Sequence, residues 1–236
     1  MIETTHIHKS FGKLKVLNGI SFKTNKGECI ALIGPNGCGK TTLIKCLLGM
    51  VVPDSGTLKF NDKDIAKDWA YRSQIGYMPQ IGRYPENMRI GQVMDMLTDI
   101  RQKTDGLDED LINAFSLKTL YNKRMGTLSG GTMQKVSASI AFLFRPDVLI
   151  LDEPTAGLDP ISAEMLKEKV LAEKRNGKLI LITSHILSEL DDLVSHIMYM
   201  QDGNLLFYKP IDELKAELGE TKLAKAVAHF MKQTMS

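Results

Sequence analysis

Residues 34–42 (GPNGCGKTT) constrain the fold of this chain more than any other segment. They have the form G-x-x-x-x-G-K-[ST], in which glycines let the backbone wrap around phosphate groups. The apolar run CIALI precedes them, and a helical pattern with Leu43, Ile44 and Leu47 follows. A strand, a glycine-rich loop and a helix in this order predict an α/β fold with a phosphate site at the end of the strand.

The side chains of this loop suit the oxygens of a nucleoside triphosphate. Lys40 is expected to reach the β- and γ-phosphate oxygens, Thr41 to offer its hydroxyl to Mg²⁺, and Thr42 to lie near the α-phosphate. The alternative is a surface turn with an incidental lysine. The pattern G-x-x-x-x-G-K-[ST] should arise by chance in about one chain in a hundred of this length. The predicted nucleotide-binding residues of the loop are Gly34, Asn36, Gly37, Gly39, Lys40, Thr41 and Thr42.

A second pair of motifs lies in residues 128–160, where LSGGTMQK is followed by VLILDEPTAGLDP. Ser129, Gly130 and Gly131 have almost no side chain, so their N–H groups and the following helix N-terminus can approach a phosphate. The run VLIL predicts a buried strand that carries Asp152 and Glu153 to the end of a sheet. Together the two motifs predict a second phosphate-binding turn and an acidic pair beside a nucleotide.

Four further residues occur in an order that matches a known family. Phe11 lies near the N-terminus, Gln80 follows IGYMP, Asp159 ends a Gly-Leu-Asp sequence, and His185 follows KLILITS. With the motifs above, they make nearly the whole chain similar to the nucleotide-binding subunit of ATP-binding-cassette (ABC) transporters. The resemblance implies that Phe11 stacks on adenine, that Gln80 and Asp159 belong to the Q-loop and the D-loop, and that His185 is the switch histidine.

The resemblance implies an α/β fold with a P-loop NTPase core of the RecA type. An antiparallel β subdomain and an inserted α-helical subdomain are expected to accompany this core. The expected domains are the core with its β subdomain in residues 1–80 and 147–210, the helical subdomain with the signature motif in 81–146, and a C-terminal helical extension in 211–236.

The residue patterns predict elements of the same kinds. Residues 1–28 read as short strands, 55–65 as a hairpin strand and 81–146 as helical. Three more strands are expected from VLILD, KLILITS and HIMYMQDG. The tail after residue 210 predicts two short amphipathic helices, which either pack on their own domain or form a partner surface.

The implied reaction is hydrolysis of the β–γ bond of ATP. Asp152, Thr41 and Gln80 are expected to hold Mg²⁺, directly or through water. Glu153 is the candidate that orients and polarises the attacking water, and His185 would contact the γ-phosphate. Glu153 as a structural acid and His185 as an ordinary histidine are the alternatives, and the order of the motifs favours the catalytic roles.

The signature turn further implies a dimer. In the family, ATP on the loop of one copy is closed over by the Ser129, Gly130 and Gly131 turn of another, so a homodimer with two composite sites is expected. Asp159 would couple the two sites. Thr132 stands where the family usually has glutamine, but the serine and both glycines are retained, so phosphate contact should survive.

Composition agrees with a subunit that needs a membrane partner. The 236 residues carry a formal net charge of +2 and no basic arm, so no nucleic-acid partner is expected. No run approaches the roughly 20 apolar residues of a membrane span, and the polar N-terminus has no signal-peptide core. We expect a cytoplasmic protein, peripheral on the inner membrane through a transmembrane permease subunit that docks near Gln80, Tyr84 and Pro85.

The sequence also allows functions other than a transporter subunit. A soluble ABC ATPase of DNA repair or translation would usually carry tandem cassettes or a long coiled-coil insertion, and a regulator without turnover should lose Glu153 or His185. The stretch AFLFRPDVLILDEPTAGLDP is similar to the ATPase subunit of the exporter that supports copper-site maturation of nitrous oxide reductase.

The 13 methionines and 3 cysteines form no clustered ligand set, so packed side chains are expected rather than a copper site. His6 and His8 could bind a metal, but a solvated strand fits them better.

Overall fold

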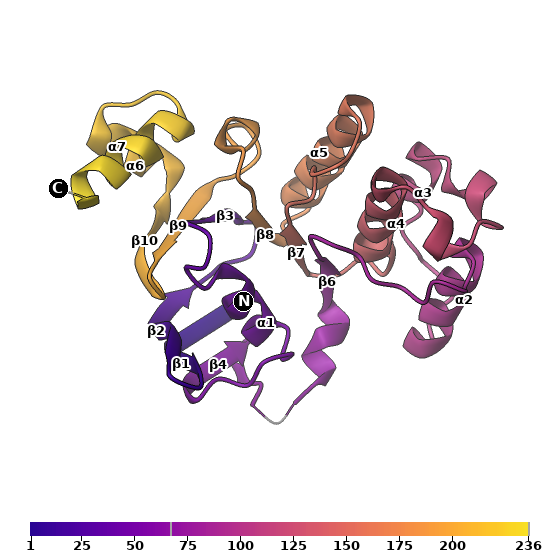
Figure 1. Ribbon diagram of the computed structural model, residues 1–236, viewed down its shortest axis with the longest axis horizontal. Coiled ribbons are helices and arrows are strands. Elements are labelled where there is room, and N and C mark those ends of the chain that lie inside the picture. The colour runs from indigo at the N-terminus through magenta and orange to yellow at the C-terminus, as the bar shows by residue number, and fades with distance from the viewer. Residues whose placement is uncertain (67, 236) are drawn as a thin grey trace. The chain divides into compact units, whose positions relative to one another are not determined.

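A computed structural model describes residues 1–66 and 68–235, with the side chains of 233–235 left out. The chain forms two compact units, one made of Met1–Arg72 with Leu179–Ser236 and the other of Ser73–Lys178. Both ends of the chain, indigo and yellow in Figure 1, therefore belong to the first unit. The predicted domain boundaries follow the motifs, and they stay a prediction.

An antiparallel sheet in the first unit contains the N-terminal strands. Its strand order is β2-β1-β4-β5, with β1 paired to both β2 and β4. Ile2, Thr4 and Ile7 are buried in β1, whereas His6 and His8 are exposed, as expected of a solvated strand. The predicted strands and hairpin are confirmed. The strands are β1 (Ile2–Phe11), β2 (Leu14–Lys23), β4 (Ser55–Phe60) and β5 (Lys63–Asp64).

Four strands of the first unit form the sheet that carries the phosphate loop. Parallel β3 lies between β8 and β9, and β10 pairs with β9 in the antiparallel direction. Every residue of β3 and β8 is buried, as expected for parallel strands covered on both faces. The phosphate loop connects β3 to helix α1. The bounds are β3 (Cys29–Ile33), α1 (Lys40–Leu47), β8 (Leu179–Thr183), β9 (His196–Gln201) and β10 (Asn204–Pro210).

Strand β10 differs from the prediction, which ended the strands at the Asp202-Gly203 turn. Its sequence, NLLFYKP, has a short continuous apolar run in place of the alternation typical of a half-buried strand, and none of its seven residues is fully buried. The two predicted C-terminal helices are confirmed as α6 (Ile211–Leu218) and α7 (Leu223–Met235). Phe230 of α7 packs edge-on against Phe207 of β10, with ring centroids 4.7 Å apart. The C-terminal helices therefore pack on their own unit, which was one of the two alternatives expected from the sequence.

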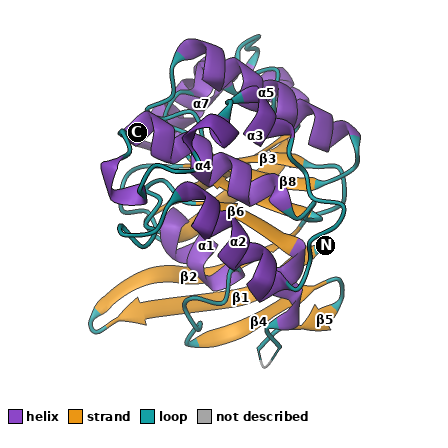
Figure 2. Cartoon of the chain, turned by 90° about the vertical axis from the view of Figure 1, so that its right-hand side faces the viewer, coloured by secondary structure: helices purple, strands orange, loops and turns teal. Residues whose placement is uncertain are grey.

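The second unit combines two parallel strands with the predicted helices, shown in orange and purple in Figure 2. Strands β6 and β7 pair in parallel, and α4 packs directly on β6, because a Cβ at Gly76 would lie 2.0 Å from the carbonyl oxygen of Ala141. Ile90, Val93 and Met94 of α2 are buried, as the helical spacing predicts. The bounds are β6 (Ile75–Met78), α2 (Ile90–Arg101), α3 (Asp110–Ala114), α4 (Gly130–Leu143), β7 (Val148–Asp152) and α5 (Pro160–Arg175).

Among the residues that the structure describes, none of the helices is both long enough and apolar enough to cross a membrane.

Candidate nucleotide-binding site

The phosphate loop is held in a curled conformation that only glycine allows at two positions. Gly34 has φ +152° and Gly39 has φ +107°. A Cβ at Gly34 would lie 2.0 Å from the carbonyl oxygen of Met200, and a Cβ at Gly39 would lie 2.7 Å from that of Val16. Neighbouring backbone therefore fixes the shape of the loop from outside.

Lys40 fills the inside of this curl. Its ammonium donates hydrogen bonds to the carbonyl oxygens of Gly34 at 2.7 Å and of Pro35 at 3.1 Å. Asn36, Gly37 and Thr41 are exposed around it. A cation inside a ring of glycine-rich backbone at a helix N-terminus is an arrangement that suits a polyphosphate, so the predicted loop residues fit a nucleotide.

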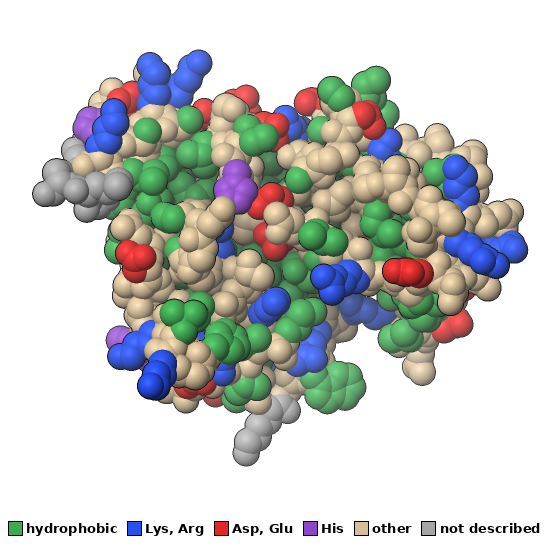
Figure 3. Space-filling model, viewed as in Figure 1, with side chains coloured by type: hydrophobic (Ala, Val, Ile, Leu, Met, Phe, Trp, Pro, Cys, Tyr) green, Lys and Arg blue, Asp and Glu red, His purple; other side chains and the backbone are tan. Residues whose placement is uncertain are grey.

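Two other predicted residues belong to the same unit. Phe11 ends β1, its side chain is 52% exposed, and the Lys9 ammonium lies 5.5 Å from its ring centroid. In Figure 3 hydrophobic and basic side chains mix over the part of the surface formed by β1 and β2, a combination that suits a base and its phosphates. His185 is exposed in the turn after β8, where the Ser184 hydroxyl accepts a hydrogen bond from the Ile186 N–H at 3.0 Å.

In the second unit, a buried strand ends at the predicted acidic pair. All five residues of β7 are buried, and Asp152 is the last of them. Glu153 follows with φ +51°, in the left-handed region that non-glycine residues rarely adopt. Such backbone persists only where surrounding structure enforces it, and it concentrates at functional sites. The charge of Asp152 adds to burial in raising the pKa of Tyr77.

The signature turn forms the exposed N-terminus of α4. Ser129 is the N-cap, and its hydroxyl accepts a hydrogen bond from the Thr132 N–H at 3.3 Å. The hydroxyl of Thr132 lies 2.9 Å from that of Ser129. Thr132, which replaces the family's usual glutamine, thus contacts the cap serine through both its hydroxyl and its N–H. The sequence pattern does not predict this contact. Nothing would contact a Cβ at Gly130, so the turn is open to a ligand.

The second unit further contains the predicted Q-loop and D-loop residues. Gln80 is exposed, and its carbonyl oxygen accepts a hydrogen bond from Gln134 at 3.0 Å. Asp159 caps α5 through the Ser162 N–H at 3.0 Å and pairs with Lys135 at 2.8 Å. The Lys135 ammonium, together with Ser162, holds the pKa of Asp159 well below its usual range. Gln134 and Lys135 lie within LSGGTMQK, although no sequence pattern predicts a role for either residue.

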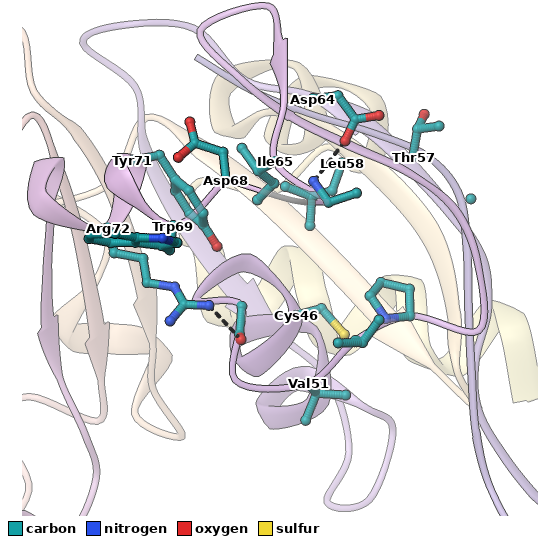
Figure 4. A pocket seen from close by; sticks show the side chains of 15 residues that line it. Cys46, Val51, Thr57, Leu58, Asp64, Ile65, Asp68, Trp69, Tyr71 and Arg72 are labelled. Carbon is teal, nitrogen blue, oxygen red and sulfur yellow. Dashed lines mark hydrogen bonds between the residues drawn. The ribbon is translucent and has the colours of Figure 1, made fainter.

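A pocket of about 360 Å³ in the first unit lies apart from the phosphate loop (Figure 4). It surrounds the C-terminal end of α1, about 12 Å along the helix from Lys40. Cys46, Leu58 and Ile65 contribute to its apolar lining, and Trp69, 75% exposed, stands beside it. Burial raises the pKa of the Cys46 thiol to about 11. Cys29, Cys38 and Cys46 are all buried, as packed thiols should be.

Comparison with known proteins places these features in one family. The model of the ABC transporter family matches residues 17–156, more than half of the chain. The Nod factor export ATP-binding protein I of Burkholderia lata is 34% identical over 210 residues, 86% of this chain and 68% of that protein. The lantibiotic transport ATP-binding protein SrtF of Streptococcus pyogenes is 33% identical over 214 residues, 90% and 92% of the two chains.

Solved structures agree with these relatives. The ATP-binding subunit of an ABC transporter superposes with a TM-score of 0.90 at 26% identity, over 98% of this chain and 99% of the other. A nucleotide-free ATP-binding cassette from an ABC transporter has a TM-score of 0.77 at 28% identity, over 96% and 98%. The predicted P-loop NTPase fold is thereby confirmed. The chain belongs to the ABC transporter family, as an ATP-binding subunit and an ATPase.

Proposed function

We propose that this chain hydrolyses MgATP between two copies of itself and thereby drives a transmembrane permease that exports its substrate. The observation that carries the proposal is the phosphate loop, in which neighbouring backbone excludes any side chain at Gly34 and Gly39 while the Lys40 ammonium occupies the curl. Phosphate oxygens would replace the loop carbonyls as partners of Lys40. Phe11, exposed at the end of β1, supplies a ring on which adenine stacks.

Hard oxygen ligands for Mg²⁺ are available in both units. Thr41 presents a hydroxyl, Asp152 a carboxylate at the end of β7, and Gln80 an amide oxygen. The described residues contain no group of three or more His, Cys, Asp or Glu side chains that could hold a metal by themselves. This donor set fits a cation that takes most of its remaining ligands from ATP and water. When bound, Mg²⁺ neutralises charge on the β- and γ-phosphates.

The proposed hydrolysis assigns the water to Glu153. Its carboxylate follows the buried strand β7 on a strained backbone, which fixes the direction of the side chain. From there it orients the attacking water and accepts its proton, while His185 and Gln80 contact the γ-phosphate. Removal of the γ-phosphate then removes the contacts that keep the site closed.

The proposed dimer uses the signature turn as the lid of the partner's site. Ser129, Gly130 and Gly131 expose the N-terminal N–H groups of a 14-residue helix, which favour a phosphate by direct hydrogen bonds and by the helix dipole. The chain carries both the phosphate loop and this turn. Two copies related by a two-fold axis can therefore complete two equal sites, with Asp159 of the D-loop coupling them.

Two surfaces support docking of a membrane partner. In the second unit Pro85 is exposed, whereas Tyr84 is half-buried with its hydroxyl 3.0 Å from that of Ser137. In the first unit the pocket at Trp69 combines an apolar lining with the charged side chains of Asp68 and Arg72, a feature typical of protein contact sites. We infer that cytoplasmic segments of the permease occupy these surfaces and hold the chain at the cytoplasmic face of the membrane.

The name of one relative supports export as the direction of transport. One acts in Nod factor export and the other in lantibiotic transport. Neither name refers to nitrous oxide reductase, DNA repair or translation, so the relatives do not support copper-site maturation or a soluble ATPase.

A pull-down from native membranes tests the proposal. Tagged Glu153→Gln protein, incubated with MgATP, should retain one polytopic membrane protein at stoichiometric level, as identified by mass spectrometry. Lys40→Ala protein is the control for nucleotide dependence. Recovery of a soluble dimer alone, or of ribosomal or nucleic-acid partners, would contradict the transporter role.

A further inference from the structure

The first two turns of α4 contact both loops that the proposed mechanism uses. Gln134 Nε2 donates a hydrogen bond to the carbonyl oxygen of Gln80 at 3.0 Å, which holds the Q-loop. The next residue, Lys135, pairs with Asp159 of the D-loop at 2.8 Å. All four residues belong to the unit Ser73–Lys178, and the proposed mechanism gives Gln134 and Lys135 no role.

The contact with the Q-loop is made at two points on one face of α4. Gln134 is buried, with 7% of its surface exposed, and Ser137 lies three residues further along the same helix face. The hydroxyls of Ser137 and Tyr84 are 3.0 Å apart. The segment that follows β6 is thus tied to α4 at residues 80 and 84.

Gln134 has one feature that packing does not explain. Its buried Oε1 has no hydrogen-bond partner among the described residues. A buried amide with an unsatisfied oxygen is costly, and an apolar side chain of similar size would avoid that cost. The hydrogen bond that Gln134 donates to the Q-loop is the contact that an apolar residue could not make.

The contact with the D-loop is likewise made at two points. A Cβ at Gly131 would lie 2.8 Å from the carbonyl oxygen of Gly157, so the signature turn lies directly against the D-loop backbone. Lys135, with 25% of its side chain exposed, reaches Asp159, which also accepts a hydrogen bond from the Ser162 hydroxyl at 2.7 Å. The low pKa of Asp159 keeps its carboxylate ionised throughout the neutral range.

We propose that Gln134 and Lys135 are positioning residues that fix the Q-loop and the D-loop to the signature helix. The two side chains leave the helix about 100° apart, so each reaches a different loop from one rigid element. The signature turn, the Q-loop and the D-loop then move together when the γ-phosphate arrives or leaves. This inference rests on the proposed ATPase mechanism, because it gives the two residues a part in its timing.

Steady-state ATP hydrolysis by purified variants tests the inference. Lys135→Met and Gln134→Met should each lower kcat about tenfold and leave the KM for ATP within about twofold, because misplaced groups slow the chemical step more than they weaken binding. Lys135→Arg, which keeps the ion pair, should restore most of the activity. The matched controls are Lys167→Met, which removes a 4.0 Å pair with the exposed Glu164 on α5, and Ser139→Ala, which removes a buried hydroxyl on α4.

A double-mutant cycle separates positioning from general stability. Lys135→Met combined with Asp159→Asn should lose less kcat than the product of the two single losses, because both changes break the same contact. Wild-type activity in both methionine variants would overturn the inference. The inference would also be overturned if Lys135→Arg failed to restore kcat and if the variants that lose kcat also had lowered melting temperatures. A wild-type chain that binds ATP without turnover would instead overturn the proposed mechanism, and this inference with it.

Discussion

Gly39 shows at the scale of one residue how backbone geometry shapes the nucleotide site. It has φ +107°, and an added Cβ would lie 2.7 Å from the backbone of Val16. Gly177 has a similar positive φ of +77°, but nothing lies within 4 Å of its Cβ position. An alanine at Gly177 would therefore cause conformational strain alone, whereas an alanine at Gly39 would also clash with backbone and distort the loop.

We expect Gly39→Ala to weaken ATP binding more than tenfold, because the loop must shift to relieve the clash. Gly177→Ala should cost about 1–2 kcal/mol of unfolding free energy through strain alone and leave ATP binding unchanged. Equilibrium binding of a fluorescent ATP analogue, with urea unfolding alongside, measures both effects. Equal ATP affinity in the two variants would contradict the assignment of the loop.

Single residues also mark the limit of prediction from the sequence. Lys40 and the loop glycines follow from a local pattern, so the sequence was enough to identify them. Gln134 and Lys135 acquire partners only when α4 packs beside the Q-loop and the D-loop, which are 54 and 24 residues away in the chain. No periodicity or spacing encodes such a contact.

At the scale of elements, a buried charged cluster joins α5 to the segment that begins α3. Lys169 donates hydrogen bonds to Asp108 at 2.6 Å and Asp110 at 2.7 Å, and it pairs with Glu173 at 2.9 Å. Burial alone would lower the pKa of Lys169, but these hydrogen bonds raise it. The side chains of Lys169 and Asp108 are 8% and 3% exposed, so the pair is shielded from water.

Lys169→Met should destabilise the chain by about 3–5 kcal/mol, because it leaves the buried Asp108 carboxylate without its cation. Lys167→Met, which removes a 4.0 Å pair with the exposed Glu164, should cost less than about 1 kcal/mol. Urea unfolding followed by circular dichroism gives both values. Similar losses in the two variants would show that the cluster does not hold α5 and α3 together.

Elements with strong periodicity were predicted well, and weakly patterned ones were not. Helix α2 and strands β3, β7 and β8 bury residues at the spacing that the sequence shows. Strand β10 lies at a sheet edge with no fully buried residue, so only its pairing with β9 defines it.

At the scale of the whole molecule, the proposed transport function requires a membrane partner. Trp69 is the only tryptophan of the chain and is 75% exposed beside the pocket. Buried aromatic anchors contribute much of the binding energy at protein interfaces. Trp69→Ser should therefore reduce recovery of the permease in the pull-down at least tenfold and leave ATP hydrolysis by the isolated chain unchanged.

Leu206→Ser, at a 43% exposed position on β10, is the control for loss of any exposed apolar side chain. It should retain the permease. Equal retention of the permease by both variants would exclude the pocket as a docking surface.

Sedimentation or light scattering of the Glu153→Gln protein tests the central claim, that two copies complete each other's sites. With MgATP the variant should have twice the mass of the chain, because ATP binds without being hydrolysed. Without nucleotide, or with Lys40→Ala or Ser129→Arg added, it should remain monomeric. A Glu153→Gln protein that binds ATP and stays monomeric would contradict the account.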